Sequence, residues 1–306
     1  MKIAIVGAGV SGCNLYFNLK EKYENITIFE KSRGTGGRLS TKYINFKEET
    51  KFIDHGAPFL MPHTDELKDF CLYLSSENIL KNRYDTFLPK NGINKICSFL
   101  IEKEDLVTQT RITKASFENK KWILEDENQN KYDDFDILLL TIPAIQILEM
   151  DIKLEEEIKS QLQEVKYDSV FTLILHSNDE IKLNENILYE NEIVKDVIDN
   201  SKKYYYKDFS SYVIHSSSEF ANQNNNKSKE EIFEIFKENI NDKSLNEISV
   251  FKTVPHLWKY GFAKTSLDIP YYFDENCKLG ICGDYFHLNN VEGSYLSSSI
   301  LSDKLM

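Results

Sequence analysis

The sequence has little of what disulfide and metal chemistry require. Its 306 residues include five cysteines and six histidines. The cysteines are odd in number, lie far apart and include no C-x-x-C pair: Cys13, Cys71, Cys97, Cys277 and Cys282. Neither a disulfide framework nor a thiolate metal site is therefore indicated. We expect reduced thiols in a cytoplasmic protein, and no bound metal.

Long apolar runs and an excess of positive charge are also missing. No window holds the roughly 18 uncharged apolar residues that a spanning helix needs, and glycines follow the first strand too early for a signal peptide. The 49 acidic and 37 basic side chains give a net charge of −12. Because such a field repels phosphate backbones and anionic lipid, we expect neither nucleic acid nor a membrane as partner. A dinucleotide held by local amides and an arginine remains compatible with it.

The apolar segments that are present predict an α/β fold. Short runs without polar residues are typical of parallel strands that are buried on both faces. The expected strands are Lys2–Val6, Ile26–Phe29, Phe135–Thr141 and Leu279–Cys282, and the expected helices are Ser11–Tyr23 and Ser294–Leu305. This order predicts a Rossmann-like domain that is assembled from both ends of the chain.

The middle of the chain has a different pattern. Strand-like segments at Ser169–His176, Ser211–His215 and Ser249–Phe262 enclose one amphipathic helix, which opens with Ser228 and Glu231 at capping-box spacing. Mixed strands without regular crossover helices predict an inserted α+β domain with an antiparallel sheet. We expect the first domain to comprise residues 1–65, 89–147 and 275–306, and the second to comprise 66–88 and 148–274.

The motif Gly7-Ala8-Gly9-Val10-Ser11-Gly12 lies between the first strand and the first helix. Gly7 permits a tight turn, Gly9 lets a pyrophosphate approach the backbone, and Gly12 lets helix and strand pack closely. Glu30 ends the next strand, where a carboxylate can bind the hydroxyls of an adenosine ribose and repel a 2′-phosphate. The alternative is a glycine turn without a ligand, which the flanking strand and helix disfavour.

Two further motifs favour a flavin over a nicotinamide cofactor. Residues 31–40 form a basic, glycine-rich loop in which Arg38, or Arg33 as second candidate, can meet phosphate oxygens. Near the C-terminus, Gly283-Asp284 follows a strand, and after Val291-Glu292 a helix that starts at Gly293 or Ser294 can turn its positive end toward a flavin ring. The alternatives are a solvated surface loop and an ordinary strand-turn-helix in which Asp284 is a cap.

These motifs resemble the glutathione-reductase-type FAD fold in its amine-oxidase branch, and specifically the renalase-like family. The resemblance extends over nearly the whole chain. It is carried by the three motifs above and by the segments Asp54-His55-Gly56-Ala57, Thr141-Ile142-Pro143-Ala144, Val213–Ser218, His256–Tyr260, Gly283-Asp284 and Val291–Ser294. One departure concerns the substrate side, because Pro58 and Phe59 stand where the family has a polar amide and a tyrosine.

The resemblance implies a non-covalently bound FAD that takes hydride from a dihydronicotinamide isomer, reduced at ring position 2 or 6, and is reoxidised by oxygen to give hydrogen peroxide. Such a transfer needs positioning and exclusion of water but no general base. No Ser/His/Asp, Cys/His or H-E-x-x-H arrangement supports a hydrolytic or metal-dependent mechanism. The sequence leaves the oligomeric state open and favours a monomer.

The resemblance also implies a set of site residues. Expected cofactor contacts are Gly7, Gly9, Val10, Ser11, Gly12, Glu30, Lys31, Arg33, Gly37, Arg38, Leu39, His55, Gly56, Ala57, Val107, Thr141, Pro143, Gly283, Asp284, Glu292, Gly293 and Ser294. Expected catalytic-site residues are His55, Phe59, Trp258 and Tyr260, with Tyr285 and Tyr295 as further aromatic candidates. On one strand, His256, Trp258 and Tyr260 share a face. For each aromatic residue, core packing is an equally good interpretation.

Two other functions stay open. FAD could serve an amine oxidase or a desaturase of an apolar compound, although the middle domain lacks an apolar entrance segment. The chain could also be a flavin-binding protein without turnover, acting as a sensor or interaction partner.

Overall fold

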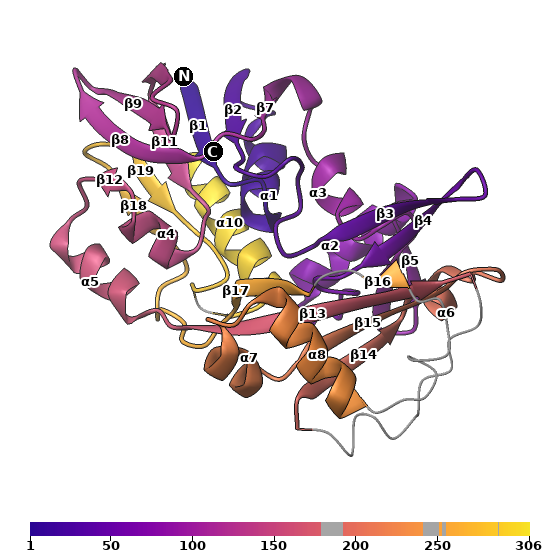
Figure 1. Cartoon of the computed structure of the whole chain (residues 1–306). Helices are drawn as coiled ribbons and strands as arrows, with labels where there is room; N and C mark the ends of the chain where they lie inside the picture. The colour runs from indigo at the N-terminus through magenta and orange to yellow at the C-terminus, as the bar shows by residue number, and fades with distance from the viewer. Residues whose placement is uncertain (179–191, 241–250, 253–254, 287) are drawn as a thin grey trace.

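The structure is a computed structural model that describes residues 1–178, 192–240, 251–252, 255–286 and 288–306 (Figure 1). Its first domain is built on a six-stranded sheet in the order β18-β19-β11-β1-β2-β7. The strands are β1 (Lys2–Val6), β2 (Asn25–Phe29), β7 (Leu106–Val107), β11 (Ile137–Leu140), β18 (Tyr272–Asp274) and β19 (Leu279–Ile281). All neighbours pair in parallel except β18 and β19, which are antiparallel. The predicted parallel strands are confirmed.

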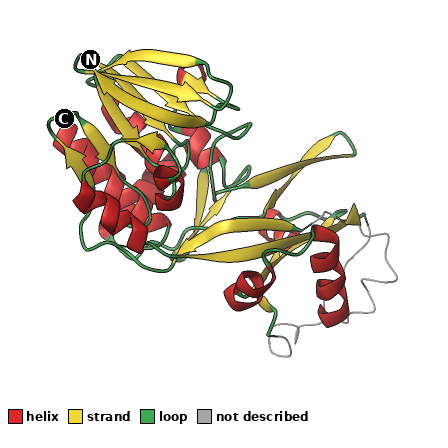
Figure 2. Cartoon of the chain, turned by 60° about the vertical axis from the view of Figure 1, so that its left-hand side comes forward, coloured by secondary structure: helices red, strands yellow, loops and turns green. Residues whose placement is uncertain are grey.

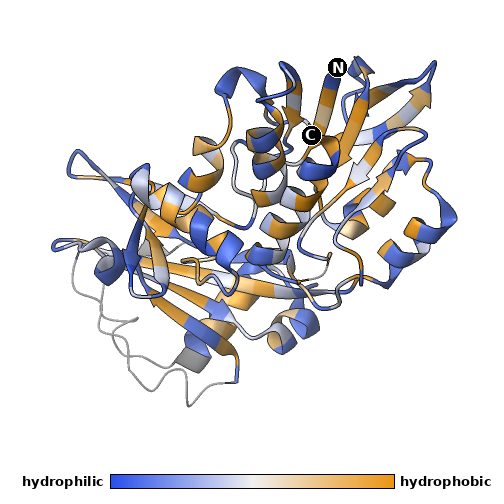
Figure 3. Ribbon diagram, turned by 180° about the vertical axis from the view of Figure 1, so that it is seen from behind, coloured by the Kyte–Doolittle hydropathy of each residue, from blue (hydrophilic) through white to orange (hydrophobic). Residues whose placement is uncertain are grey.

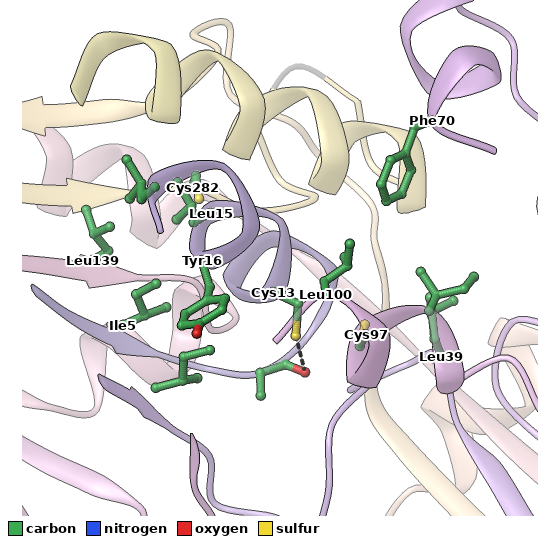
Figure 4. Close-up of a cluster of buried hydrophobic side chains, with 14 of the residues drawn as sticks. Ile5, Cys13, Leu15, Tyr16, Leu39, Phe70, Cys97, Leu100, Leu139 and Cys282 are labelled. Carbon is green, nitrogen blue, oxygen red and sulfur yellow. Dashed lines mark hydrogen bonds between the residues drawn. The ribbon is translucent and has the colours of Figure 1, made fainter. Parts of the chain in front are cut away.

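One face of this sheet carries helices. Because side chains alternate along a strand, Ile3 and Ile5 of β1 point to the side covered by α1 (Val10–Leu19) and α10 (Val291–Leu305). Figure 4 shows this core, with Leu15 and Cys282 packed between sheet and helices and with Phe70 directed at the start of α10. The Phe70 ring stacks on Tyr295 of α10 at 4.6 Å.

The opposite face carries a second sheet and two short helices. Ala4 and Val6 of β1 point into this second core. Its covering elements are β8 (Ile112–Glu118), β9 (Lys121–Asp126), β10 (Lys131–Phe135), β12 (Asp151–Ile152), α4 (Ala144–Leu148) and α5 (Glu156–Glu164). The helix α3 (Lys95–Phe99) and the 3-10 helix η1 (Lys103–Asp105) do not belong to this second core. The six-stranded sheet is therefore buried on both faces, as its uninterrupted apolar strands require.

The second domain is a five-stranded sheet with helices on one side (Figure 2). Its elements are β13 (Tyr167–Ser177), β14 (Val194–Asp199), α6 (Asn200–Tyr204), β15 (Ser210–Ser216), α7 (Ser218–Asn224), α8 (Lys229–Ile240), β16 (Phe251–Lys252) and β17 (His256–Ala263). All described pairings are antiparallel. The predicted capping box is confirmed, since the Ser228 amide donates to the Glu231 carboxylate (2.8 Å) and the Glu231 amide donates to the Ser228 hydroxyl (3.2 Å). The part of the predicted strand at 249–250 and 253–254 lies outside the described residues.

Two hairpins and one helix connect the domains. They are β3 (Thr41–Phe46) with β4 (Glu49–Asp54), α2 (Asp65–Ser76), and β5 (Leu80–Arg83) with β6 (Thr86–Pro89). Figure 3 shows hydrophobic residues along the inner faces of these elements and of both sheets. No helix within the described ranges combines the length and hydrophobicity needed to cross a membrane.

Three segments that lie outside the predicted first domain pack on its six-stranded sheet or belong to it. Residues 66–88 pack into the core beneath α1 and α10, through Leu67, Phe70 and Leu74, and not into the second domain. Residues 148–165 pack against the other face of the six-stranded sheet, through Ile158 and Leu162. Strand β18 also belongs to the first sheet. Apolar patterning marks these segments as buried, but only tertiary packing decides which core they join.

Close backbone packing at Gly12 generates a first prediction. A Cβ added at Gly12 would lie 1.9 Å from the Gly7 carbonyl oxygen, so we expect Gly12→Ala to lower the free energy of unfolding by about 1–3 kcal/mol or more. A Cβ at Gly34 would meet nothing within 4 Å, so the control Gly34→Ala should stay within about 0.5 kcal/mol of the parent. Urea titration of the two variants measures the difference, and equal stability would contradict the packing described here.

Candidate functional site

The turn between β1 and α1 forms a cradle at the carboxyl edge of the sheet. Gly7 has a φ of +110°, which favours glycine, and its amide donates to the Phe29 carbonyl at 2.8 Å. A Cβ added at Gly9 would meet nothing within 4 Å, so open space adjoins this residue. Gly9 is also the N-cap of α1, so the free amides of the first helical turn lie next to it and can bind an anion. The residue types and the space both suit a pyrophosphate.

Glu30 holds this turn together. Its side chain is buried, and its two carboxylate oxygens accept from the Ala8 amide (2.9 Å) and the Ser32 amide (2.7 Å). The Glu30 amide donates to the Val107 carbonyl at 2.8 Å, so β7 contributes backbone at this edge. One carboxylate therefore fixes the loops on both sides of the predicted ribose position, and each oxygen keeps a lone pair for a ligand hydroxyl.

The glycine-rich loop folds back onto the turn. The Gly36 amide donates to the Ala8 carbonyl at 2.8 Å, and a Cβ at Gly37 would lie 3.4 Å from the Gly9 Cα. Leu39 is buried in the first core, whereas Lys31 and Arg33 are exposed. The loop is thus ordered by backbone contacts, and its two exposed cations border the cradle.

Arg38 makes a contact that the sequence did not predict. Its guanidinium donates two hydrogen bonds to the Asp284 carboxylate, both at 2.7 Å, and a longer one to the Gly261 carbonyl at 3.4 Å. Burial lowers the pKa of Arg38, but the Asp284 carboxylate more than offsets this and raises it overall. We expected Arg38 to face phosphate oxygens. In this structure Arg38 bonds Asp284, which is another residue expected at the cofactor, and it also reaches β17 of the second domain.

The C-terminal motif is arranged around the start of α10. This helix begins at Val291, three residues before the predicted start, because Asn290 caps it by accepting from the Gly293 amide at 2.9 Å. The buried Glu292 carboxylate accepts from the His63 and Thr64 amides, so it anchors that loop. The Glu292 carboxylate thus has a structural partner within the protein, and a contact of Glu292 with the cofactor stays a prediction.

Small residues bring α1, α10 and β11 close to the cradle. The Ser11 hydroxyl donates to the Ser294 carbonyl at 3.0 Å, and the Thr141 hydroxyl lies 3.0 Å from both the Val6 and Gly7 carbonyls. Pro143 is the N-cap of α4. Because the Thr141 hydroxyl bonds the first turn, we assign it a role in shaping the cradle.

A cluster of three histidines and a tryptophan, hereafter the His/Trp cluster, joins the two domains. Its members are His55, His215, His256 and Trp258. The Trp258 ring lies 4.3 Å from His256 and 5.7 Å from His55. The His55 carbonyl is 3.3 Å from the Trp258 indole nitrogen and 3.2 Å from Nε2 of His215. These contacts bring together the predicted residues His55, His256 and Trp258, and add His215.

His55 is neutral at physiological pH. Burial, followed by the proximity of His256, lowers its pKa to about 4. Its Nε2 lies 3.1 Å from the Ser40 hydroxyl, and among the described residues its buried Nδ1 has no hydrogen-bond partner. Burial also lowers the pKa of His215 and of His256. The cluster therefore offers uncharged aromatic surface.

The residue before His55 explains how the cluster is held. Asp54 is fully buried and forms an ion pair with the buried Lys203 of α6, at 2.5 Å. The same carboxylate accepts from the Tyr204 hydroxyl, the Thr41 hydroxyl (2.6 Å) and the Ile93 amide (2.9 Å). Sequence reasoning missed this hub, since Lys203 lies 149 residues away. The sign available in the sequence was a carboxylate in an apolar segment, since a buried carboxylate needs a charged or hydrogen-bonding partner.

The other aromatic candidates lie elsewhere. Phe59 is 38% exposed. Tyr285 is buried in the first domain and donates to the Ile142 carbonyl at 3.0 Å, and Tyr295 packs on Phe70. Tyr260 contacts Tyr167 at 5.5 Å, beyond a bulge that separates it from Trp258. The interpretation as core packing therefore suits Tyr285 and Tyr295.

Comparisons with known proteins agree with this geometry. Residues 5–74 match the family model of an NAD(P)-binding Rossmann-like domain. Protoporphyrinogen oxidase 2 of Arabidopsis thaliana is 27% identical over 111 residues, which is 34% of this chain and only 22% of that protein.

Solved structures align over the whole chain. A putative protoporphyrinogen oxidase from Exiguobacterium sp. 255-15 has a TM-score of 0.65 and 11% identity, covering 99% of this chain and 98% of its own. A fatty acid isomerase from P. acnes has a TM-score of 0.68 and 11% identity, covering 100% and 99%. A putrescine oxidase has a TM-score of 0.66 and 10% identity, covering 99% and 98%. These comparisons bear out the predicted fold class.

The open space at Gly9 generates a second prediction. In Gly9→Ala the new methyl group clashes with no protein atom but enters the space that a pyrophosphate requires. We expect the dinucleotide content of the purified variant to fall at least about tenfold, with the cofactor-free protein unchanged within about 0.5 kcal/mol in free energy of unfolding. Absorbance of acid-released cofactor and urea titration give the two values. Full cofactor retention would contradict the cradle assignment.

The low pKa of His55 generates a third prediction. Between pH 6.5 and 4 the unfolded chain protonates this ring while the folded chain does not, so stability is complete above pH 6.5 and falls as the pH drops. The loss should reach at most about 3 kcal/mol.

The matched variant is His55→Asn, which removes the titrating ring. We expect it to lose less free energy of unfolding than the parent between pH 7.5 and 4.5, when both are measured by urea titration. Parallel pH profiles of parent and variant would rule out a buried neutral His55.

Proposed function

We propose that the protein is an FAD-dependent oxidase that oxidises dihydronicotinamide isomers, with oxygen as the electron acceptor. The observation that carries the proposal is the neighbourhood of two features: a dinucleotide cradle at Gly7–Gly12, and an uncharged His/Trp cluster between the domains. Arg38 lies between them, because its guanidinium bonds Asp284 and its carbonyl accepts from the Ala57 amide, two residues after His55.

The residues present suit FAD. Gly9 leaves space for a pyrophosphate, Glu30 has lone pairs for ribose hydroxyls, and the buried Asp284 lies at the end of β19. An acidic residue at the position of Glu30 disfavours a 2′-phosphate. When bound, FAD supplies the hydride acceptor and the reaction with oxygen that yields hydrogen peroxide.

The His/Trp cluster suits a flat, uncharged ring. Trp258 and His55 offer aromatic faces and edges, and the indole and imidazole donors that meet the His55 carbonyl hold these rings in place. Hydride transfer needs a fixed geometry and a dry site, and removes no separate proton. The neutral His55 adds no charge to its side of the site.

An amine substrate is the second candidate, because putrescine oxidase shares the fold. A protonated amine calls for a carboxylate or an open aromatic cage. Among the described residues, Asp54 is the carboxylate nearest in sequence to the cluster, and Lys203 already neutralises it. This contact favours the dihydronicotinamide over the amine.

The test is anaerobic reduction of the purified yellow protein. We expect NADH isomers made by borohydride reduction of NAD to bleach the flavin absorbance within seconds, whereas ordinary NADH and putrescine do so far more slowly. Admission of oxygen should restore the colour with one hydrogen peroxide per flavin.

The alternatives predict different results. Bleaching by amines alone would support an amine oxidase. A flavin that no donor reduces would support a binding protein without turnover, and either result would overturn the proposal.

A further inference from the structure

One lysine of the β3–β4 hairpin faces the second domain without an ion-pair partner. Lys42 pairs across the hairpin with Ile53, so both side chains lie on one face of the two strands. Ile53 is fully buried against Ile174 and Val213 of the second domain. Lys42 is partly buried at the inner end of this face, and no described residue forms an ion pair with it.

The next residues on this face are apolar. Ile44 and Phe46, at alternate positions after Lys42, pack on the same cluster as Ile53. The hairpin packs on one face of the five-stranded sheet, because Ile53 contacts Ile174 of β13 and Val213 of β15 (Figure 1). The charged side chain of Lys42 therefore lies between the apolar residues of this face and the His/Trp cluster.

Electrostatic coupling places Lys42 beside two histidines. Burial lowers the pKa of His176, and the charge of Lys42 lowers it further. Lys42 also contributes to the low pKa of His55, after burial and His256. Burial lowers the pKa of Lys42 itself. Lys42 thus acts on His55, which follows its cross-strand neighbour Ile53 by two residues at the same end of the hairpin.

The charges around the cluster are unusual for so acidic a protein. Lys195 acts on His215 and Lys229 acts on His256, so each of the three histidines has a lysine nearby. The carboxylates that act on them are Asp54 and Asp196. Asp54 is neutralised by Lys203, and Asp196 is exposed on β14. With a net charge of −12, this local excess of lysine favours an anion.

We propose that Lys42 is a specificity-determining residue that binds a phosphate group of the substrate, so that the site selects a dihydronicotinamide nucleotide over its unphosphorylated riboside. This proposal rests on the proposed function. Lysine binds phosphate as a compact charge with three donors, and a nucleotide places a phosphate one ribose away from its nicotinamide ring. The ring would meet His55 and Trp258, and the phosphate would meet Lys42.

The test compares a phosphorylated and an unphosphorylated ligand on the flavin-loaded protein. Borohydride-generated isomers of dihydronicotinamide mononucleotide and of dihydronicotinamide riboside serve as substrates. Lys42→Gln should raise KM for the mononucleotide at least about tenfold, the range expected for a lost hydrogen bond to a charged group. The riboside KM and both kcat values should stay within about twofold, and Lys42→Arg should largely restore the mononucleotide KM.

Lys195→Gln is the matched control, since it removes an equal charge near His215. We expect it to change the mononucleotide KM less than threefold. An equal effect of both variants would indicate a diffuse field, and an equal effect of Lys42→Gln on both substrates would indicate a purely structural role. Either result overturns the assignment of Lys42.

Equilibrium binding separates this proposal from the proposed function. Calorimetry with nicotinamide mononucleotide and nicotinamide riboside needs no turnover, and Lys42→Gln should weaken only the mononucleotide. If this holds but no dihydronicotinamide reduces the flavin, the function fails while the phosphate site stands. If the parent protein is reduced by both isomers but Lys42→Gln binds both ligands as the parent does, the phosphate site fails alone.

Discussion

The site depends on the close approach of backbone segments at the carboxyl end of β1. Gly12 packs on the Gly7 carbonyl, and the buried Glu30 carboxylate binds the amides on both sides of the turn. A side chain on Gly12 would separate the helix from the strand. Without the Glu30 carboxylate, the buried Ala8 amide would lose its acceptor, at a cost of about 1–3 kcal/mol, and the more exposed Ser32 amide would bind water in its place. The same contacts that hold the fold together therefore shape the space beside Gly9.

Charged contacts join this cradle to the second domain. Arg38 bonds Asp284 and reaches the Gly261 carbonyl, and Asp54 bonds Lys203. The Asp54 pair is fully enclosed, so removing either partner would leave an unpaired buried charge, at a cost of about 3–5 kcal/mol. Such contacts fix the relative position of the two domains, because apolar contacts alone would allow one core to slide along the other. His55 lies directly after Asp54, and this explains why the His/Trp cluster forms at the junction.

Several features of both domains could be predicted from local pattern. The apolar run of β1, the Gly7–Gly12 spacing and the capping box at Ser228 are each encoded within a few residues, and the structure has all three. Residues 66–88 and 148–165 pack on the two cores of the six-stranded sheet, which the sequence could not indicate, because amphipathic segments carry no information on which core buries them. The partners of Arg38 and Glu292 were missed for a related reason. Each lies more than 200 residues away in sequence, and a charged residue next to a motif gives no sign of its distant partner.

The central claim is that the cradle at Gly7–Gly12 holds a flavin dinucleotide. The most direct measurement is native mass spectrometry of the purified, folded chain, before and after incubation with FAD. The account predicts a monomer mass increased by one FAD, in the isolated protein or after incubation, and release of FAD on denaturation. A folded chain that carries no dinucleotide and takes up none from solution would contradict it.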